Sequence, residues 1–252
     1  MDVACSTFCF QDEPLDKALR RIAELEFTRV DLGVSSSGSH ITPDAVVSDL
    51  SGVLLRIRQG PTIGISGITL RLDSPENEAA FVEASAHLAK QLATAVLTID
   101  PRPGNSSVDA EIQRLTPLHR ACSRQGVVLC VSTKQDSATG TPAGAVELCE
   151  RLPGIGLSLD PSPFVLAGVQ MEEWDQTFEF VRHVFLRDTS QVHGQFQTAV
   201  GRGEIDYSKI VVALQKFNYR GALVVDFEKG YGGDVEPQIE ARKLGRVLES
   251  LL

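Results

Sequence analysis

The fold is decided by the stretch Gly154-Ile155-Gly156-Leu157-Ser158-Leu159-Asp160-Pro161-Ser162-Pro163-Phe164. Its apolar and small residues lead into one carboxylate, Asp160, and Pro161 then ends the run. This pattern is typical of a buried parallel strand with an acid at its carboxyl end. In a barrel of parallel strands, chemistry takes place at that end. Asp160 therefore marks a candidate site.

Further apolar runs alternate with amphipathic segments along the whole chain. The predicted strands are residues 3–7, 28–33, 64–70, 95–100, 126–132, 155–160, 181–187 and 222–228. Helices are predicted over residues 15–26, 43 to about 57, a segment capped by Ser74, then 107–125, 141–152, 172–178, 206–217 and 235–252. Such alternation implies parallel strands joined by crossover helices. We expect an α/β protein with one (β/α)8 TIM barrel domain over residues 1–252, because eight repeats match the usual size of that fold.

A doubly wound open sheet is the alternative fold. Such a sheet usually carries a glycine-rich phosphate-binding turn after its first strand. Here the first predicted strand is followed by Phe8-Cys9-Phe10, without a glycine. The barrel is therefore the preferred prediction.

Charge and composition narrow the class of partner. The formal net charge is −9, whereas a protein that binds a nucleic-acid backbone needs a basic face, so no nucleic-acid partner is expected. No stretch approaches the roughly 20 apolar residues that cross a bilayer, and Asp2 stands where a signal peptide would be basic. The five cysteines form no CxxC pair, which favours buried thiols in a reducing compartment. We expect a cytoplasmic protein without a membrane partner.

Charged and polar side chains stand at the predicted carboxyl ends of the strands. They include Asp31, Asp100, Ser132, Lys134, Asp160, Arg187, Asp188, Asp226 and Glu228. Carboxylates that share one cup repel each other unless cations, protons or hydrogen bonds compensate. The candidate compensating charges are Arg71, Lys134, Arg187 and a divalent metal ion.

The chain resembles the xylose isomerase-like TIM barrel family of sugar phosphate isomerases and epimerases. The resemblance is strongest in the second half, in residues 126–129, 156–161, His183-Val184-Phe185-Leu186-Arg187-Asp188, 200–207 and Tyr219-Arg220-Gly221-Ala222-Leu223-Val224-Val225-Asp226. It implies a sugar or sugar phosphate isomerase or epimerase that acts on a small carbohydrate at the carboxyl face of the barrel. It also implies one divalent metal with four side-chain ligands.

Carried over to this sequence, the four ligand positions of the family fall on Ser132, Asp160, Phe185 and Asp226. Asp160 matches, and Asp226 keeps the charge on a shorter side chain. Ser132 is a poor ligand, Phe185 is none, and Pro163 replaces a histidine that is frequent in the family. Two carboxylates hold a Mg²⁺ or Mn²⁺ ion only weakly. The metal expectation is therefore one weakly held divalent cation at Asp160 and Asp226, or no cation.

Three functions stay open at this point. The first is a sugar isomerase or epimerase in which Asp160, Asp226 and Lys134 are catalytic. The second is a non-catalytic barrel that binds a carbohydrate or a protein partner. The third is a metal-independent carbonyl enzyme in which Lys134 forms a Schiff base. The candidate substrate contacts are Arg187, Asp188, Asp31, Asp100 and Glu228.

Other residues have two interpretations each. Arg187 either contacts a ligand or forms an internal ion pair. His183, on the same side of its strand as Phe185, is expected to be a buried, hydrogen-bonded residue rather than a ligand. Gly201-Arg202-Gly203 is either an anion-binding loop or a turn before the next helix. A homo-oligomer is a further partner prediction.

Overall fold

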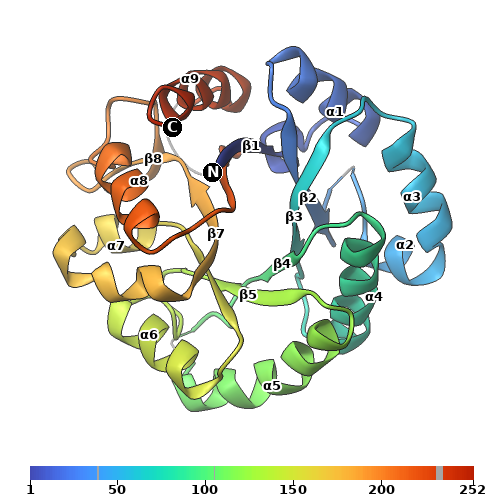
Figure 1. Cartoon of the computed structure of the whole chain (residues 1–252), viewed down its shortest axis with the longest axis horizontal. Helices are drawn as coiled ribbons and strands as arrows, with labels where there is room; N and C mark the ends of the chain where they lie inside the picture. Colours follow the sequence, from blue (N-terminus) through green and yellow to red (C-terminus); the bar gives the residue numbers. More distant parts are fainter. Residues whose placement is uncertain (39, 105, 231–234) are drawn as a thin grey trace.

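In the computed structural model, which describes residues 1–38, 40–104, 106–230 and 235–252, eight parallel strands close into a barrel. The order around it is β1-β10-β7-β6-β5-β4-β3-β2. The strand bounds are β1 (Asp2–Ser6), β2 (Arg29–Ser35), β3 (Gly64–Arg71), β4 (Val96–Ile99), β5 (Val128–Ser132), β6 (Gly156–Leu159), β7 (Val181–Leu186) and β10 (Ala222–Val225). The first and last strands pair in parallel, so the predicted TIM barrel is confirmed (Figure 1).

Helices surround the strands on the outside of the barrel (Figure 1). They are α1 (Leu15–Glu24), α2 (Pro43–Ser48), α3 (Leu50–Arg58), α4 (Glu78–Gln91), α5 (Val108–Arg124), α6 (Pro142–Arg151), α7 (Ser162–Leu166), α8 (Tyr207–Lys216) and α9 (Pro237–Glu249). In α1 the apolar residues Leu15, Leu19 and Ile22 are buried, so burial follows the helical period. None of the described helices is long and apolar enough to span a membrane.

One helix prediction is wrong in its interior and another is wrong at its start. The segment from residue 43 to 57 is broken at Asp49, whose backbone leaves the helical region (φ −146°, ψ 63°) and whose side chain accepts from Gly52 N. An aspartate that caps a new helix competes with continuation of the old one. Ser74 does not cap α4, because it accepts from Glu76 N in a preceding turn, and the helix starts after Asn77.

The region from residue 161 to 198 has more elements than the sequence predicts. The helix expected at 172–178 is two 3₁₀ turns, η2 (Met171–Glu173) and η3 (Asp175–Phe180), and the short helix α7 precedes them. After β7 the chain forms an antiparallel hairpin of β8 (Asp188–Ser190) and β9 (Gln195–Thr198). A short antiparallel ribbon attached to a parallel barrel breaks the alternating pattern, so the periodicity argument misses it.

The inside of the barrel is layered by the alternation of side chains along each strand. On β7 and just beyond it, His183, Phe185 and Arg187 occupy alternate positions. His183 lies deep, with Nε2 2.8 Å from Asp31 Oδ2, and its ring meets Phe185 edge to face with centroids 5.0 Å apart. Thr69 Oγ1 donates to the other oxygen of Asp31 at 2.6 Å. The predicted burial of His183 is confirmed. The alternate positions that follow it along the chain are Phe185 and then Arg187.

The buried Asp31 and His183 pair needs a glycine on β3. A Cβ atom added at Gly67 would lie 2.7 Å from Asp31 Oδ2 and 2.9 Å from His183 Nε2. Both neighbours are fully enclosed, so they have little room to move. Gly67 therefore marks a close approach of strand and side chains.

We expect Gly67→Ala to lower the free energy of unfolding by about 1–3 kcal/mol through overpacking against this pair. Chemical denaturation followed by circular dichroism measures the change. Gly64→Ala on the same strand is the control, because its nearest neighbour would lie at an ordinary 3.4 Å. Equal stability of the two variants would contradict the close approach at Gly67.

Candidate functional site

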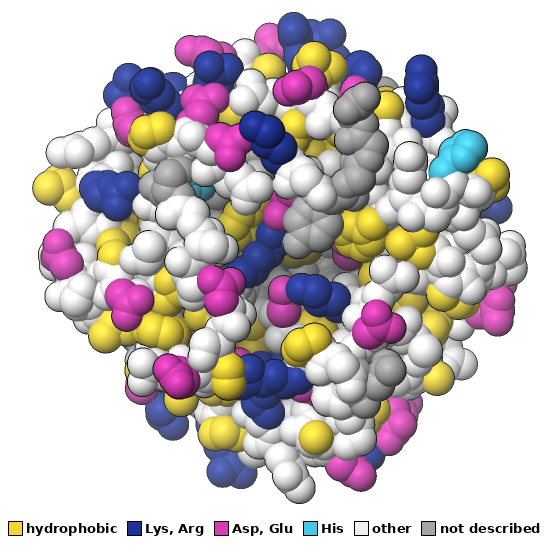
Figure 2. Space-filling view, turned by 180° about the vertical axis from the view of Figure 1, so that it is seen from behind, with side chains coloured by type: hydrophobic (Ala, Val, Ile, Leu, Met, Phe, Trp, Pro, Cys, Tyr) yellow, Lys and Arg dark blue, Asp and Glu magenta, His cyan; other side chains and the backbone are white. Residues whose placement is uncertain are grey.

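A cup opens at the carboxyl ends of the strands, on the face turned away from the viewer in Figure 1. Figure 2 shows this face, where acidic and basic side chains gather around a central hollow. The cavity has a volume of about 60 Å³. Its lining includes Arg71, Asp100, Ser132, Lys134, Asp160, Phe185, Arg187, Asp226 and Glu228. The structure thus brings together most of the residues that the sequence places at strand ends.

Arg187 lies at the centre of the charged groups. Its Nη2 atom is 2.6 Å from Asp226 Oδ2 and 3.2 Å from Asp160 Oδ2. The residue is only 3% exposed, so these pairs are shielded from solvent. Burial lowers the pKa of the Arg187 guanidinium, but the charges of Asp160, Asp226 and Glu228 outweigh burial and raise it. Arg187 is therefore a fixed positive charge between two carboxylates.

Arg71 and Glu228 form a second ion pair beside the first. Arg71 Nη1 donates to Glu228 Oε2 at 2.5 Å, and Arg71 Nη2 is 3.5 Å from Asp226 Oδ2. The Phe8 ring lies 4.0 Å from the guanidinium carbon and supports it from the side. Burial and the nearby charge of Asp226 raise the pKa of the Glu228 carboxyl, against the lowering effect of Arg71. Glu228 thus holds its proton more tightly than a solvated glutamate.

Some polar atoms in the cup have no partner. Asp226 Oδ1, Arg187 Nε and Arg187 Nη1 are buried without a hydrogen bond within the described part of the chain. Buried polar atoms without partners are costly, and in native proteins they frequently mark a functional place. Glu228 Oε1 is 4.0 Å from Arg187 Nη1, which is too far for a hydrogen bond.

A third group lies on the opposite side of the cup. Ser132 Oγ donates to Asp100 Oδ1 at 2.7 Å, and Lys134 Nζ lies 2.5 Å from Asp100 Oδ2. The Lys134 side chain is 49% exposed, so water reaches its ammonium group. Burial raises the pKa of the Asp100 carboxyl, but the charges of Lys134 and Arg71 outweigh it and lower the pKa. Lys134 thus has a carboxylate partner other than Asp160 and Asp226.

Two predicted substrate contacts lie outside the cavity. Asp31 is fully buried below the cup, where His183 and Thr69 occupy its carboxylate. Asp188 is also buried, and its Oδ2 accepts from Gly201 N at 2.7 Å and from Gly203 N at 3.1 Å. The backbone groups of the predicted anion-binding loop are therefore taken by Asp188. Both carboxylates hold the structure together around the cup.

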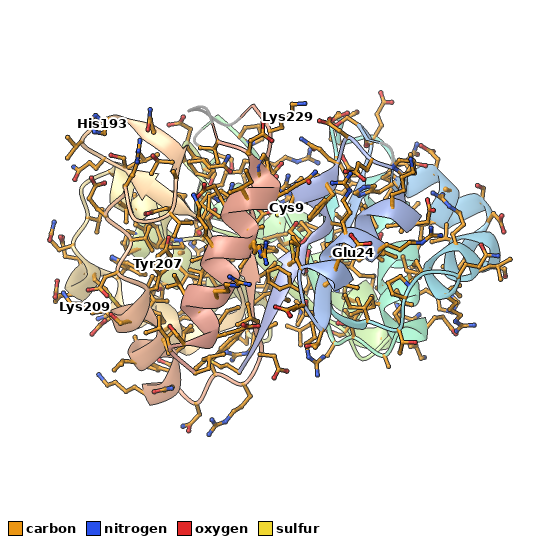
Figure 3. All side chains as sticks on the ribbon, turned by 90° about the horizontal axis from the view of Figure 1, so that it is seen from above. Cys9, Glu24, His193, Tyr207, Lys209 and Lys229 are labelled. Carbon is orange, nitrogen blue, oxygen red and sulfur yellow. The ribbon has the colours of Figure 1, made fainter. Side chains whose placement is uncertain are left out.

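The hairpin β8–β9 supplies residues that sequence reasoning missed. Phe196 stacks on Arg187, with the guanidinium carbon 4.8 Å from the ring centroid. Gln197 bonds both backbone groups of Glu228, donating to its carbonyl at 2.7 Å and accepting from its N–H at 2.8 Å. In Figure 3 the hairpin residue His193 and Lys229, which follows β10, lie at the same end of the barrel. The signal was Gly194 followed by alternating Gln and Phe, which is typical of a short hairpin.

The residues present do not fit a divalent metal at Asp160 and Asp226. One oxygen of each carboxylate, Asp160 Oδ2 and Asp226 Oδ2, is already paired with Arg187 Nη2, which lies between them. Ser132 is bound to Asp100, and Phe185 presents an apolar ring to the cavity. Across the described ranges, no group of three or more His, Cys, Asp or Glu residues is arranged to hold a metal ion. The resemblance to a four-ligand site therefore stops at the position of Asp160 and the charge of Asp226.

Comparison with known proteins agrees with the barrel. Residues 56–250 match the model of the xylose isomerase-like TIM barrel family. A search of curated proteins found no match.

Solved structures with the same fold include several sugar epimerases. A D-allulose 3-epimerase from Methylomonas sp. in complex with D-allulose has a TM-score of 0.77 at 11% identity, covering 100% of this chain and 97% of that one. A 3-keto-D-glucoside 4-epimerase from E. coli has a TM-score of 0.75 at 15% identity, with 99% of each chain covered. A xylose isomerase-like protein from Mycobacterium smegmatis in complex with magnesium has a TM-score of 0.74 at 18% identity, covering 100% and 97%. At these identities the likeness concerns the fold.

We expect Lys134→Met to destabilise the protein only above the pH at which Asp100 titrates. Because the folded-state pKa of Asp100 is lowered, the pair stabilises the fold above the ordinary value of 3.8 and loses this effect as the pH falls through the lowered pKa. The pair is partly exposed, so we expect a loss of less than about 1 kcal/mol at pH 7.

Urea denaturation at about pH 7 and about pH 2 compares the variant with the parent protein, and the difference should shrink at the lower pH. Lys90→Met is the control, because the hydrogen-bond partner of Lys90 is the uncharged Gln125. A difference that persists unchanged at low pH would show that Lys134 stabilises the fold by packing.

Proposed function

Because the chain belongs to the xylose isomerase-like TIM barrel family, we propose that it binds a small unphosphorylated carbohydrate and isomerises it without a divalent metal. One observation carries this proposal. Asp160, Asp226 and Glu228 converge with Arg71 and Arg187 on one small cavity at the carboxyl ends of the strands. Carboxylates that move protons, beside cations that stabilise an oxyanion, are the groups that carbonyl chemistry requires. The likeness to epimerases acting on D-allulose and 3-keto-D-glucoside supports a carbohydrate ligand.

The size of the cavity favours the end of an open-chain sugar. Its volume of about 60 Å³ is well below the roughly 300–1,000 Å³ of sites that enclose a drug-sized ligand. The carbonyl carbon and its neighbour fit such a space, while the rest of the molecule lies in the mouth. Phe185 and Phe196 supply apolar walls for carbon atoms.

The charge of the cup favours a ligand without phosphate. Among the residues that the structure describes, the charged groups that line it are four carboxylates (Asp100, Asp160, Asp226 and Glu228) and three cations (Arg71, Lys134 and Arg187). A phosphate would add negative charge to this excess. Barrel enzymes often bind phosphate in loops after the seventh and eighth strands. In the loop after β7, the N–H groups of Gly201 and Gly203 already bind Asp188.

Glu228 is the best-placed group to carry the proton. Asp160 Oδ2 and Asp226 Oδ2 are engaged by Arg187, while Glu228 Oε2 pairs with Arg71 and Glu228 Oε1 lies 4.0 Å from Arg187 Nη1. Burial and Asp226 raise the pKa of the Glu228 carboxyl above its ordinary value, which makes its carboxylate a stronger base. Gln197 fixes the Glu228 backbone, so the side chain enters the cup from a constant position.

The chemistry then needs one base. The Glu228 carboxylate removes the proton from the carbon beside the carbonyl, and the electron pair of that C–H bond moves toward the carbonyl oxygen. Arg71 and Arg187 balance the negative charge that develops on this oxygen. In the resulting enediolate the hydroxyl proton of the neighbouring carbon passes to the former carbonyl oxygen, and the new C=O bond forms at that neighbour. Glu228 then returns its proton to the former carbonyl carbon on the same face, which converts a ketose into an aldose or the reverse. Epimerisation would require a second base on the opposite face.

Two other functions are tested by the contacts of the cup. A non-catalytic carbohydrate-binding barrel is favoured by the engagement of Asp160 and Asp226 with Arg187. The Schiff-base function of Lys134 has less support, because an amine nucleophile must be free of a carboxylate partner, and Lys134 Nζ lies 2.5 Å from Asp100 Oδ2. Borohydride trapping with small ketoses tests it. The compartment and the homo-oligomer stay predictions.

Proton exchange in deuterated water tests the proposed reaction. Nuclear magnetic resonance follows deuterium entry beside the carbonyl, and ketose–aldose conversion, for a panel of free sugars and sugar phosphates with a chelator present throughout. We expect activity on free sugars and a loss of about 100-fold or more in Glu228→Gln, because a general base contributes about 10²–10⁴-fold. Sugar binding measured by calorimetry should be retained, since glutamine still accepts a bond from Arg71.

Glu83→Gln is the matched control, because Glu83 is an exposed residue of α4 outside the cup. Binding without exchange of any sugar would favour the non-catalytic function. Exclusive formation of an epimer would overturn the single-base reaction, and the absence of both binding and turnover would reject the proposal.

A further inference from the structure

Arg187 stands where a divalent cation would bridge Asp160 and Asp226. We propose that its guanidinium is the resident cation of this cup and that it excludes a divalent metal. The inference concerns the charge at the centre of the site, so it stands whether or not a bound carbohydrate is turned over. The positive charge at the centre of the site then comes from a side chain of the protein itself.

The contacts of Arg187 are those of a bridging ion. A single nitrogen, Nη2, lies 2.6 Å from Asp226 Oδ2 and 3.2 Å from Asp160 Oδ2. An ion that joined these two oxygens would have to occupy the space that Nη2 fills. The guanidinium is planar and always charged, so no change of pH near neutrality opens that space.

The surroundings hold both partners in place. Asp160 Oδ1 accepts from Ser162 N at 2.9 Å, and Asp160 N donates to Thr133 Oγ1 at 2.8 Å. Phe196 covers the guanidinium from the hairpin side, with the guanidinium carbon 4.8 Å from its ring centroid. Arg187 is 3% exposed. Its side chain therefore has little freedom to swing out and admit an ion.

The position of Arg187 follows from β7. Alternation along the strand carries His183, Phe185 and Arg187 to the inside of the barrel, one layer above the other. Phe185 lies in the layer below Arg187. It stands where the family resemblance implies a histidine, and its phenyl ring cannot bind a metal ion. The same strand thus presents a phenyl ring to the cup at Phe185, keeps His183 below it paired with Asp31, and is followed by the cation Arg187.

Removal of Arg187 should create a metal site. Without it, Asp160, Asp226 and Glu228 form a buried cluster of three carboxylates with one remaining cation, Arg71, next to Glu228 and Asp226. Carboxylate oxygens are the ligands that Mg²⁺ and related hard cations take. Repulsion between carboxylates makes the empty cluster unfavourable, so an added cation should bind and stabilise it.

The test is a titration with Mn²⁺ alone, followed by electron paramagnetic resonance of the free ion, on the full chain. The parent protein should bind no stoichiometric Mn²⁺ at millimolar concentration. Arg187→Gln should bind one Mn²⁺ at least about 100-fold more tightly, because a cation close to the site has been removed. Its melting temperature should rise with Mn²⁺, whereas that of the parent should not.

Arg71→Gln is the matched control, because it removes the same charge from the same cup and leaves Arg187 between Asp160 and Asp226. We expect it to gain less than about 10-fold in Mn²⁺ affinity. An equal gain in the two variants would overturn the proposal, since general charge would then explain the effect.

Arg187→Gln leaves buried carboxylates unpaired, so a folding failure must be distinguished from a binding failure. The double variant Arg187→Gln with Asp226→Asn restores the charge balance, and we expect it to fold and to bind Mn²⁺ less tightly than Arg187→Gln refolded in Mn²⁺. Stoichiometric binding of Mn²⁺ by the parent protein overturns the proposal without any variant. So does tighter binding by the double variant than by Arg187→Gln.

Discussion

The contact of the Arg187 guanidinium with Asp160 and Asp226 is the interaction on which the rest of the cup depends. Three carboxylates within one buried cluster would repel each other and resist folding if no cation lay among them. Arg187 lies between two of them and Arg71 binds the third. Breaking a buried pair of this kind typically costs about 3–5 kcal/mol, because an unpaired charge remains inside. The stability of the cup therefore depends on the pairing of its carboxylates with these two arginines.

The barrel determines which side chains come close enough to form these ion pairs. Strand alternation places Asp31 and His183 in a lower layer, Phe185 above them, and Arg187 with Asp226 at the mouth. Gly67 leaves room for the lower pair, and the hairpin β8–β9 brings Phe196 and Gln197 over the upper layer. A polar interior of this kind needs its groups matched with partners, and within the described part of the cup three buried atoms, on Arg187 and Asp226, lack a hydrogen bond.

Sequence reasoning located the cup because strand ends are readable from apolar runs that stop at a charged residue. That logic placed Asp100, Asp160 and Asp226 on one face, and the structure brings all three to one cavity. The same logic failed for Asp31 and Asp188, which also follow the strand pattern. Asp31 lies one layer too deep, and Asp188 is turned toward the loop of Gly201 and Gly203. Depth and direction depend on the stagger of neighbouring strands, which the sequence of a single strand does not contain.

By itself, the sequence determined the (β/α)8 barrel and the family, and the resemblance to that family predicts that Ser132 and Phe185 stand at two of its four ligand positions. The barrel follows from local information, the hydrophobic period and the turn residues, whereas the two ligand positions are what the family resemblance implies. Only the tertiary structure decided that Arg187 joins Asp160 and Asp226 while Lys134 joins Asp100. The physical reason is that ion pairing depends on distances of a few ångströms between residues far apart in the chain. Those distances exist only once the barrel has closed.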